Sequence, residues 1–194
     1  MTQKPINDTI VLQEMMTHPA LFFHPAPKII AIHGDHDQKL LQEVLKHTTV
    51  TQICHDKKHA DPRVNPFSQK KKTLFDIIIL AEKSDTESFA SHLSLLNPNG
   101  LLVQQSTSLL EIDSLKSLQQ QLINSGFSDV LPLTFLWKTV VVAFKESHFK
   151  RIREKDIFNR PFKTLYYNID THKAAMALPE FARHLLTIEE VTHS

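Results

Sequence analysis

A short polar turn at His33–Gln38, HGDHDQ, holds the densest group of side chains that could do chemistry. Two aspartates and two histidines lie within five residues, beside a single glycine, Gly34. Two carboxylates would repel a phosphate, and side chains at the flanking positions would block the close backbone approach that a phosphate-binding loop needs. We therefore expect a ligand of this turn to be cationic, or to offer hydroxyl and amine groups.

The same residue types could also bind a divalent metal ion. However, neighbouring residues of one turn rarely converge on one point, and no second cluster with clear metal-ligand spacing accompanies them. His55 and His59 lie four positions apart, a spacing that suits a metal only if their segment is helical. We expect no metal site.

Cys54 is the single cysteine of the chain and ends a predicted strand. No histidine or asparagine can be assigned to it as a partner, which favours a buried structural thiol over a nucleophile. One cysteine excludes an internal disulfide and fits a reducing compartment. The absence of a Gly-x-Ser-x-Gly motif disfavours a serine hydrolase.

Composition narrows the class of protein further. The chain has 194 residues, 41% of them hydrophobic, and a formal net charge of +1. This balance is typical of a globular domain and argues against a general nucleic-acid binder. The basic run Lys70–Lys72 lacks interleaved aromatic residues and is interpreted as solvated surface. No apolar stretch approaches the roughly 18 residues of a membrane span, and the N-terminus MTQKPINDTI has no apolar core of signal-peptide length. We therefore expect a cytoplasmic protein.

The elements that must position the polar turn follow from apolar periodicity. Ile29–Ile32 is a predicted strand, and Gln38–His47 is a predicted helix with one apolar face. Strand, tight turn and helix open a nucleotide-type α/β fold, in which the turn contacts the ligand. Further strands are predicted at Val50–Cys54, Phe75–Leu80, Leu101–Gln105, Asp129–Phe135 and Lys138–Lys145, and further helices at Asn7–Phe23, Thr86–Leu96, Leu109–Ser125, Phe149–Ile157 and Lys173–Leu186.

The order of these elements predicts the fold class. Strands and helices alternate until the last two strands, which lie too close for a crossover helix and must pair antiparallel. We predict a methyltransferase-like Rossmann fold: a doubly wound α/β sheet, mostly parallel, with a C-terminal antiparallel hairpin. The expected organisation is a single domain over residues 1–194, with an N-terminal helix at 7–23, a core at 28–145 and a helical tail at 146–194. Residues 55–73 are expected to form a loop.

Four segments, in the same order, resemble the spermidine synthases, the polyamine aminopropyltransferases. The first, LQEMMTHPALFFHPAPKIIAIHGDHDQKLLQEVLKH, is similar to the family's Gln-Glu-Met-Leu-Thr-His, its Gly-Gly-Gly-Asp-Gly-Gly turn and its Leu-Arg-Glu-Val helix. FDIIILAEKSD resembles the family's Phe-Asp-Val-Ile-Ile-x-Asp-x-x-Asp-Pro, and LNPNGLLVQQS its Leu-x-Pro-Gly-Gly-x-x-x-x-Gln. The tail, LYYNIDTHKAAMALPEF, is similar to Tyr-Tyr-Asn-x-x-x-His-x-Ala-(Phe)-x-Leu-Pro.

The resemblance implies a reaction as well as a fold. Family members join decarboxylated S-adenosylmethionine to putrescine and release methylthioadenosine. Acidic side chains hold the cationic amines, and one carboxylate helps to deprotonate the attacking nitrogen. The family's dimeric assembly implies a possible homodimer, although no counterpart of the family's N-terminal β-domain is recognised in this sequence.

Motif matches assign the candidate site residues. Gln13 and Glu14 match the family's Gln-Glu, and Asp37 matches the acidic residue of its glycine turn. Asp85 lies one step from the position of the family's second aspartate. The implied residues are Gln13, Glu14, Asp37 and Asp85 for substrate, and Gly34, Asp37 and Gln105 for the decarboxylated S-adenosylmethionine co-substrate, if the protein is active.

Other motif positions depart from the family. Ala81 occupies the place of the catalytic aspartate, and Cys54 that of the ribose-binding glutamate. Side chains replace the glycines of the turn at Asp35, His36, Gln38 and Lys39. Because loss of a general base costs roughly two to four orders of magnitude in rate, we assign no catalytic residue.

Three functions stay open from the sequence. The first is an inactive, divergent homologue, a pseudoenzyme, that keeps a polyamine or partner site. The second is an active aminopropyltransferase in which Glu82 or Asp85 replaces the lost base. The third is an interaction protein that retains only the fold, with an intact paralogue as a possible partner.

Overall fold

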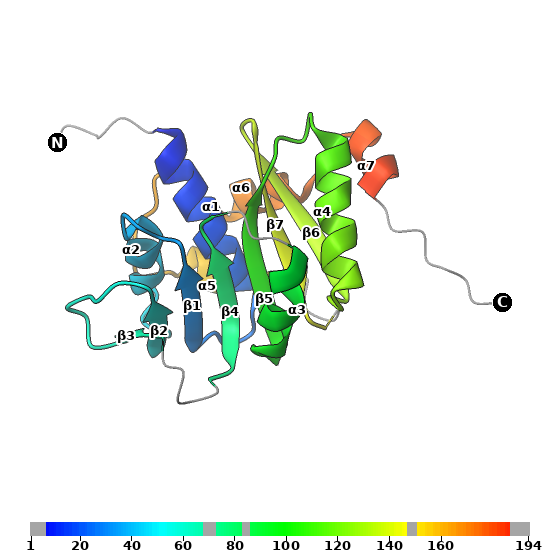
Figure 1. Cartoon of the computed structure of the whole chain (residues 1–194). Coiled ribbons are helices and arrows are strands. Elements are labelled where there is room, and N and C mark those ends of the chain that lie inside the picture. Colours follow the sequence, from blue (N-terminus) through cyan, green and yellow to red (C-terminus); the bar gives the residue numbers. More distant parts are fainter. Residues whose placement is uncertain (1–6, 68–72, 83–85, 147–150, 187–194) are drawn as a thin grey trace.

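A computed structural model describes residues 7–67, 73–82, 86–146 and 151–186 (Figure 1). Seven strands form one sheet in the order β3-β2-β1-β4-β5-β7-β6. The strands are β1 Ile29–His33, β2 Gln52–His55, β3 Val64–Pro66, β4 Phe75–Leu80, β5 Leu96–Ser106, β6 Asp129–Phe135 and β7 Lys138–Phe144. The helices are α1 Asp8–Phe23, α2 Lys39–Leu45, α3 Thr86–Ser94, α4 Ile112–Asn124, α5 Glu154–Phe158, α6 Ile169–Met176 and α7 Glu180–Leu186.

The strand directions confirm the predicted fold class. β1 pairs in parallel with both β2 and β4, and β4 pairs in parallel with β5. β7 is antiparallel to β5 and to β6, so the last two strands form the expected hairpin. All six residues of β4 are buried, as a central strand covered on both faces requires.

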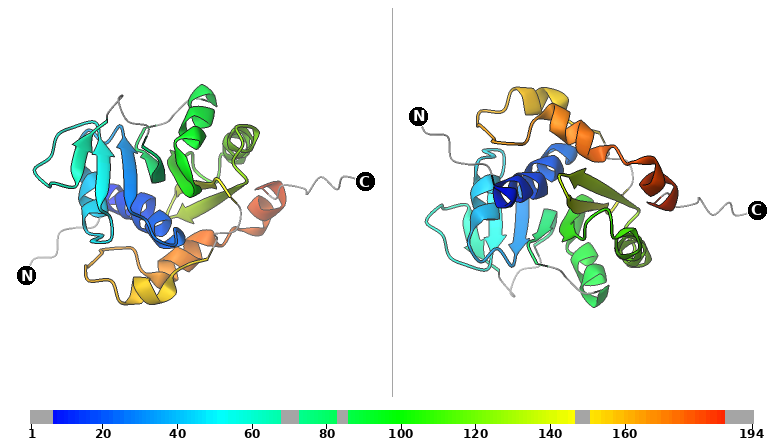
Figure 2. Two further views of the ribbon diagram at one scale, coloured as in Figure 1. Left: turned by 90° about the horizontal axis from the view of Figure 1, so that it is seen from below. Right: turned by 90° about the horizontal axis from the view of Figure 1, so that it is seen from above.

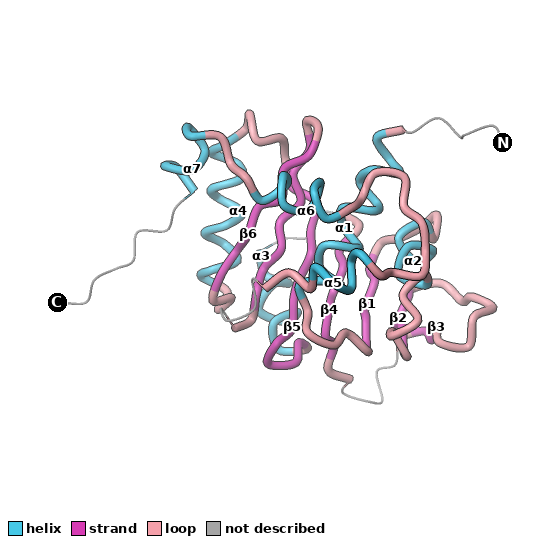
Figure 3. The backbone as a smooth tube through the Cα atoms, turned by 180° about the vertical axis from the view of Figure 1, so that it is seen from behind, coloured by secondary structure: helices cyan, strands magenta, loops and turns pink. Residues whose placement is uncertain are grey.

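Helices cover both faces of the sheet (Figure 2). Alternate residues of β1 and β4 point to opposite faces, because side chains in a strand alternate. Ile30 and Ile77 pack on the side of α1, α2, α5 and α6, which lie in front of the sheet in Figure 3. Ala31 and Ile78 pack on the side of α3, α4 and α7. No helix among the described residues is long and apolar enough to cross a membrane.

The N-terminal helix α1 begins one residue later than predicted. The side chain of Asn7 caps the helix by accepting a hydrogen bond from the backbone N–H of Ile10 (3.0 Å). From Glu14 to Phe23 every residue of α1 is buried. The helix therefore packs within the core.

Several elements differ from the sequence prediction, and three examples concern β3, β5 and the pair α6 and α7. The predicted loop at residues 55–73 contains β3, which extends the edge of the sheet beside β2. Three residues including a proline carry too little alternation to predict a strand. β5 begins at Leu96, five residues earlier than expected. The predicted helix Lys173–Leu186 is two helices, α6 and α7, separated around Pro179, because proline disrupts the interior of a helix.

Candidate functional site

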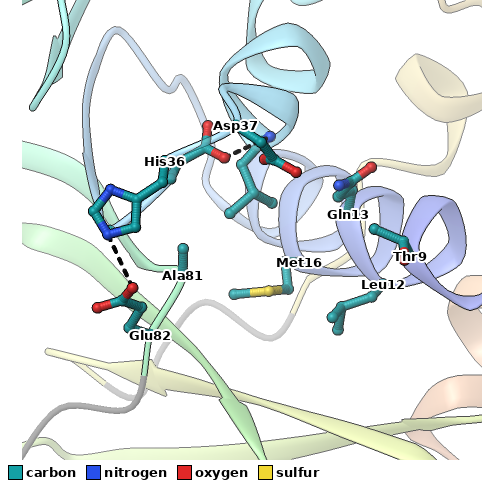
Figure 4. Close-up of a pocket in the computed structure, with 11 residues that line it drawn as sticks. Thr9, Leu12, Gln13, Met16, His36, Asp37, Ala81 and Glu82 are labelled. Carbon is teal, nitrogen blue, oxygen red and sulfur yellow. Dashed lines mark hydrogen bonds and ion pairs between the residues drawn. The ribbon is translucent and has the colours of Figure 1, made fainter.

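The candidate site lies where the sheet changes winding direction. From β1 the chain moves outward to β2 and β3, then returns to form β4 on the other side of β1. Ligands of doubly wound sheets bind at the carboxyl ends of the strands at such a point. A cavity of about 380 Å³ lies there (Figure 4), lined by Thr9, Leu12, Gln13, Met16, Gly34, Asp35, His36, Asp37, Leu40, Ala81 and Glu82.

The two aspartates of the polar turn have different roles. Asp35 is buried, and its carboxylate accepts hydrogen bonds from the backbone N–H groups of Leu40 (3.3 Å) and Leu41 (2.8 Å) at the start of α2. Its Oδ2 also lies 3.6 Å from Nε2 of the buried His55. Asp35 thus supports the first turn of α2, a position where acidic groups stabilise a helix.

Asp37 is exposed at the cavity and is paired with the neighbouring ammonium of Lys39. Oδ2 of Asp37 lies 2.6 Å from Nζ of Lys39. The hydrogen bond from the Lys39 side chain is the largest effect on the Asp37 carboxyl and holds its pKa below the usual range. Asp37 is therefore ionised at neutral pH, and a cationic ligand must compete with an internal cation for it.

The segment after β4 carries Ala81 and Glu82 into the cavity. The backbone N–H of Ala81 donates to the carbonyl of His33 (2.9 Å), which continues the β1–β4 pairing to the carboxyl edge. Oε1 of Glu82 lies 3.0 Å from Nε2 of His36, and both side chains are exposed. Glu82 and His36 together form a carboxylate–imidazole pair at the rim of the cavity (Figure 4).

The two neighbouring residues of α1 that were assigned to substrate lie in different places. Gln13 lines the cavity. Glu14 does not belong to the cavity lining: its side chain is buried and accepts three backbone N–H bonds, from Leu165 (2.7 Å), Tyr166 (2.9 Å) and Tyr167 (2.8 Å). The structure thus gives Glu14 a structural role, anchoring the helical tail to α1.

Cys54 and Asp56 lie at the carboxyl end of β2. Cys54 is buried, and burial raises the pKa of its thiol. Asp56 was not predicted as a site residue, and its Oδ2 accepts a hydrogen bond from the backbone N–H of Gly34 (2.8 Å). A carboxylate directly after a strand of a Rossmann sheet was the signal that could have identified it. The ring of His33 stacks on Phe67 beside this edge, with centroids 4.3 Å apart.

Two assignments remain, Gln105 and Asp85. Gln105 is half-buried in β5 opposite Val140 and is not part of the cavity lining. Asp85 lies outside the described residues. Within the part of the chain that the structure describes, no group of three histidine, cysteine or acidic side chains could hold a metal ion.

Comparison with known proteins assigns the family. Residues 9–61 match the model of the spermine/spermidine synthase domain. A polyamine aminopropyltransferase of Alkalilimnicola ehrlichii is 34% identical over 93% of this chain and 78% of that protein, and one of Thioalkalivibrio sulfidiphilus is 33% identical over 92% and 79%. The chain belongs to the polyamine aminopropyltransferase family.

Solved structures agree with the fold of this aminopropyltransferase homologue. The spermidine synthase of Thermotoga maritima superposes with a TM-score of 0.79 at 22% identity, over 92% of this chain and 75% of that one. A spermidine synthase in complex with the transition-state analogue AdoDATO superposes with a TM-score of 0.80, over 96% and 78%. A ribosomal protein L11 methylase of Lactobacillus delbrueckii gives 0.53 over 72% of this chain, in keeping with the methyltransferase-like sheet.

One residue of the polar turn, Gln38, has a backbone conformation that favours glycine. Gln38 has φ 58°, in the left-handed region, at a position where the family motif has glycine. A left-handed backbone at a non-glycine residue destabilises the folded state by roughly 1–2 kcal/mol. Substitution by glycine relieves this strain, but glycine also raises the entropy of the unfolded chain, which offsets part of the gain in stability. We expect Gln38→Gly to raise the free energy of unfolding by about 0.5–1 kcal/mol, measured by urea denaturation.

Gln42→Gly is the matched control for this prediction. Gln42 is exposed in the body of α2, where glycine is expected to lower stability by about 1 kcal/mol. If both substitutions destabilise the protein equally, the strain assigned to Gln38 is wrong.

Proposed function

We propose that this protein is an inactive aminopropyltransferase homologue that retains a site for polyamines. Ala81 carries the proposal. It lines the cavity directly after β4, at the position where the family resemblance expects the catalytic aspartate. A methyl group cannot accept a proton from an ammonium substrate, and an ammonium has no lone pair with which to attack.

The co-substrate half of the site supports the same conclusion. The ribose-binding glutamate is replaced by Cys54, a buried thiol whose pKa is raised and which therefore stays neutral. Asp56, the nearby carboxylate, already accepts a hydrogen bond from Gly34. We expect decarboxylated S-adenosylmethionine to gain little from this edge.

The cavity suits a small cationic amine. Carboxylates of Asp37 and Glu82 lie at its rim, and the Gln13 amide and apolar side chains of α1 form its wall. A diamine offers a charged group at each end and methylenes between them, which matches this distribution. Because Lys39 and His36 already pair with the two carboxylates, we expect weak binding of putrescine or spermidine.

A second candidate function, an active aminopropyltransferase, is favoured by one observation. The Glu82–His36 pair lies at the cavity next to Ala81 and has the chemistry of a general base. In that case Glu82 would replace the catalytic aspartate. Asp85, the other candidate base, lies outside the described residues.

Glu82→Gln separates the two functions. For an inactive homologue we expect the substitution to lower putrescine affinity, measured by titration calorimetry, by about three- to tenfold. Neither the parent protein nor the variant should form product. For an active enzyme we expect methylthioadenosine release to fall by roughly two to four orders of magnitude. Glu111→Gln, an exposed carboxylate before α4, is the control and should change neither.

The remaining parts of the proposal concern organisation and partners. We propose a single domain over residues 1–194 in the cytoplasm, without nucleic-acid or membrane partners. A homodimer, or assembly with an intact paralogue, is the proposed quaternary state, and co-purification of the tagged protein tests it. If neither polyamines nor nucleosides bind, the function lies with such a protein partner.

A further inference from the structure

A second cavity, of about 260 Å³, lies at the end of α1 opposite the candidate site. It is formed where α1 ends, where α2 leads into β2, and where the chain turns after α5. Among the described residues, it shares none with the lining of the candidate site. Its lining comprises Phe22, His47, Thr48, Thr49, Arg153, Asp156, Asn159, Arg160, Pro161 and Phe162.

The charge of this cavity is positive. Arg153 and Arg160 contribute two guanidinium groups that stay charged at any physiological pH. Asp156 is the one carboxylate among the described residues of the lining, and it pairs with Arg153. An arginine pair with a single carboxylate leaves an excess positive charge for a ligand to neutralise.

Both guanidinium groups are held in place by the backbone. Arg153 donates from Nε to the carbonyl of His24 (3.0 Å) and from a terminal nitrogen to that of Leu21 (2.7 Å). Arg160 donates to the carbonyl of Ile157 (2.6 Å). Fixed guanidinium groups lose little conformational freedom when they bind an anion.

Arg160 also has an unused donor. Its Nε is buried and has no hydrogen-bond partner in the part of the chain that the structure describes. A buried donor without an acceptor is costly, and an anion in the cavity could supply one. The exposed hydroxyl groups of Thr48 and Thr49 and the amide of Asn159 are further polar groups of the lining.

Aromatic rings form the rest of the wall. The rings of His47 and Phe162 lie 4.7 Å apart, and the guanidinium of Arg153 lies 5.5 Å from the centroid of Phe22. Burial first, and then nearby positive charges that include both arginines, lower the pKa of His47 to about 2. The imidazole of His47 is therefore a neutral part of the cavity wall at physiological pH.

We propose that this cavity binds a small organic anion, a phosphate or carboxylate group carried on a flat apolar body. The guanidinium groups and threonines would take the anionic group, and the aromatic wall would contact the body. The proposal is independent of the polyamine site, because the two cavities lie at opposite ends of α1.

The test uses phenyl phosphate as the probe, titrated into ¹⁵N-labelled full-length protein and followed by the amide signals of Thr48 and Thr49. Inorganic phosphate and benzoate distinguish the anionic groups, and phenol is the neutral control. We expect saturable shifts with phenyl phosphate or benzoate, weaker binding of inorganic phosphate, and affinity that falls with added salt.

Two near-isosteric substitutions at exposed positions give opposite expected effects. Asp156→Asn removes the one carboxylate of the lining and should tighten binding by about three- to tenfold, whereas Asn159→Asp adds a carboxylate and should weaken binding by a similar factor. A purely structural role for the arginines predicts no such pair of changes. The proposal is overturned if phenyl phosphate and benzoate give no saturable shift up to about 10 mM, roughly ten times a millimolar dissociation constant. It is also overturned if phenol binds equally well, or if both variants bind like the parent protein.

Discussion

Glu14→Ala is expected to lower the free energy of unfolding by about 3–5 kcal/mol, a large part of the stability of an ordinary domain. The Glu14 carboxylate is buried and accepts the backbone N–H groups of Leu165, Tyr166 and Tyr167. Removing it leaves three donors without an acceptor and frees the start of the tail from α1. Urea denaturation followed by circular dichroism measures the change.

Two companion variants make this result interpretable. Glu14→Gln keeps the shape of the side chain but places an amide N–H₂ against the same donors, so we expect it to lower the free energy of unfolding by about 2 kcal/mol. It replaces Glu14→Ala in the test if that variant does not fold. Gln13→Ala is the neighbouring control, because Gln13 lines the cavity and makes no such bonds. It should change stability by less than about 0.5 kcal/mol. Equal stability of Glu14→Ala and the parent protein would contradict the anchoring role.

The protein is expected to lose stability steeply below pH 6.5. Burial lowers the pKa of His47 to about 2 and that of His172 to about 4, from an ordinary value of 6.5. The unfolded chain therefore binds more protons than the native state as the pH falls from 6.5 towards these values. The stability conferred by the neutral rings is complete above pH 6.5. At pH 5 roughly 2 kcal/mol is lost for each histidine.

Urea denaturation at several pH values between 7.5 and 5 checks this expectation. His172→Gln removes one titrating group and should flatten the slope by about 1.2 kcal/mol per pH unit between pH 6 and 5. Because His172 also forms a hydrogen bond with the hydroxyl of Tyr167, we expect the substitution to lower the free energy of unfolding at neutral pH as well. A parent protein whose stability does not vary between pH 7.5 and 5 would contradict neutral burial of these rings.

Strong local patterns predicted most of the fold from the sequence. The apolar run of Phe75–Leu80 gave a strand with the same bounds in the structure, and the short separation of β6 and β7 correctly predicted an antiparallel pair. β3 could not be predicted in this way, because its only hydrophobic anchor is Val64 and its pairing depends on β2. The break between α6 and α7 was missed although Pro179 marks it.

The candidate site was harder to predict because residue type does not fix orientation. Asp35 and Asp37 are two residues apart and both contribute to the cavity lining, yet Asp35 is buried and supports α2, whereas Asp37 is exposed and pairs with Lys39. Glu14 matched a family motif and is nevertheless bound by the backbone of the tail, 151 residues away in sequence. Such partners are fixed by the tertiary fold, which local sequence patterns do not contain.

The central claim is that aminopropyl transfer is lost while a site for cations remains. Titration calorimetry of the purified protein with decarboxylated S-adenosylmethionine, in the presence of saturating putrescine, tests it most directly. Putrescine alone should give saturable heat and raise the thermal stability by mass action. The account predicts that decarboxylated S-adenosylmethionine then produces no saturable heat and no methylthioadenosine. Micromolar binding of this co-substrate, with release of methylthioadenosine, would contradict the account and establish Glu82 as the leading candidate for the base.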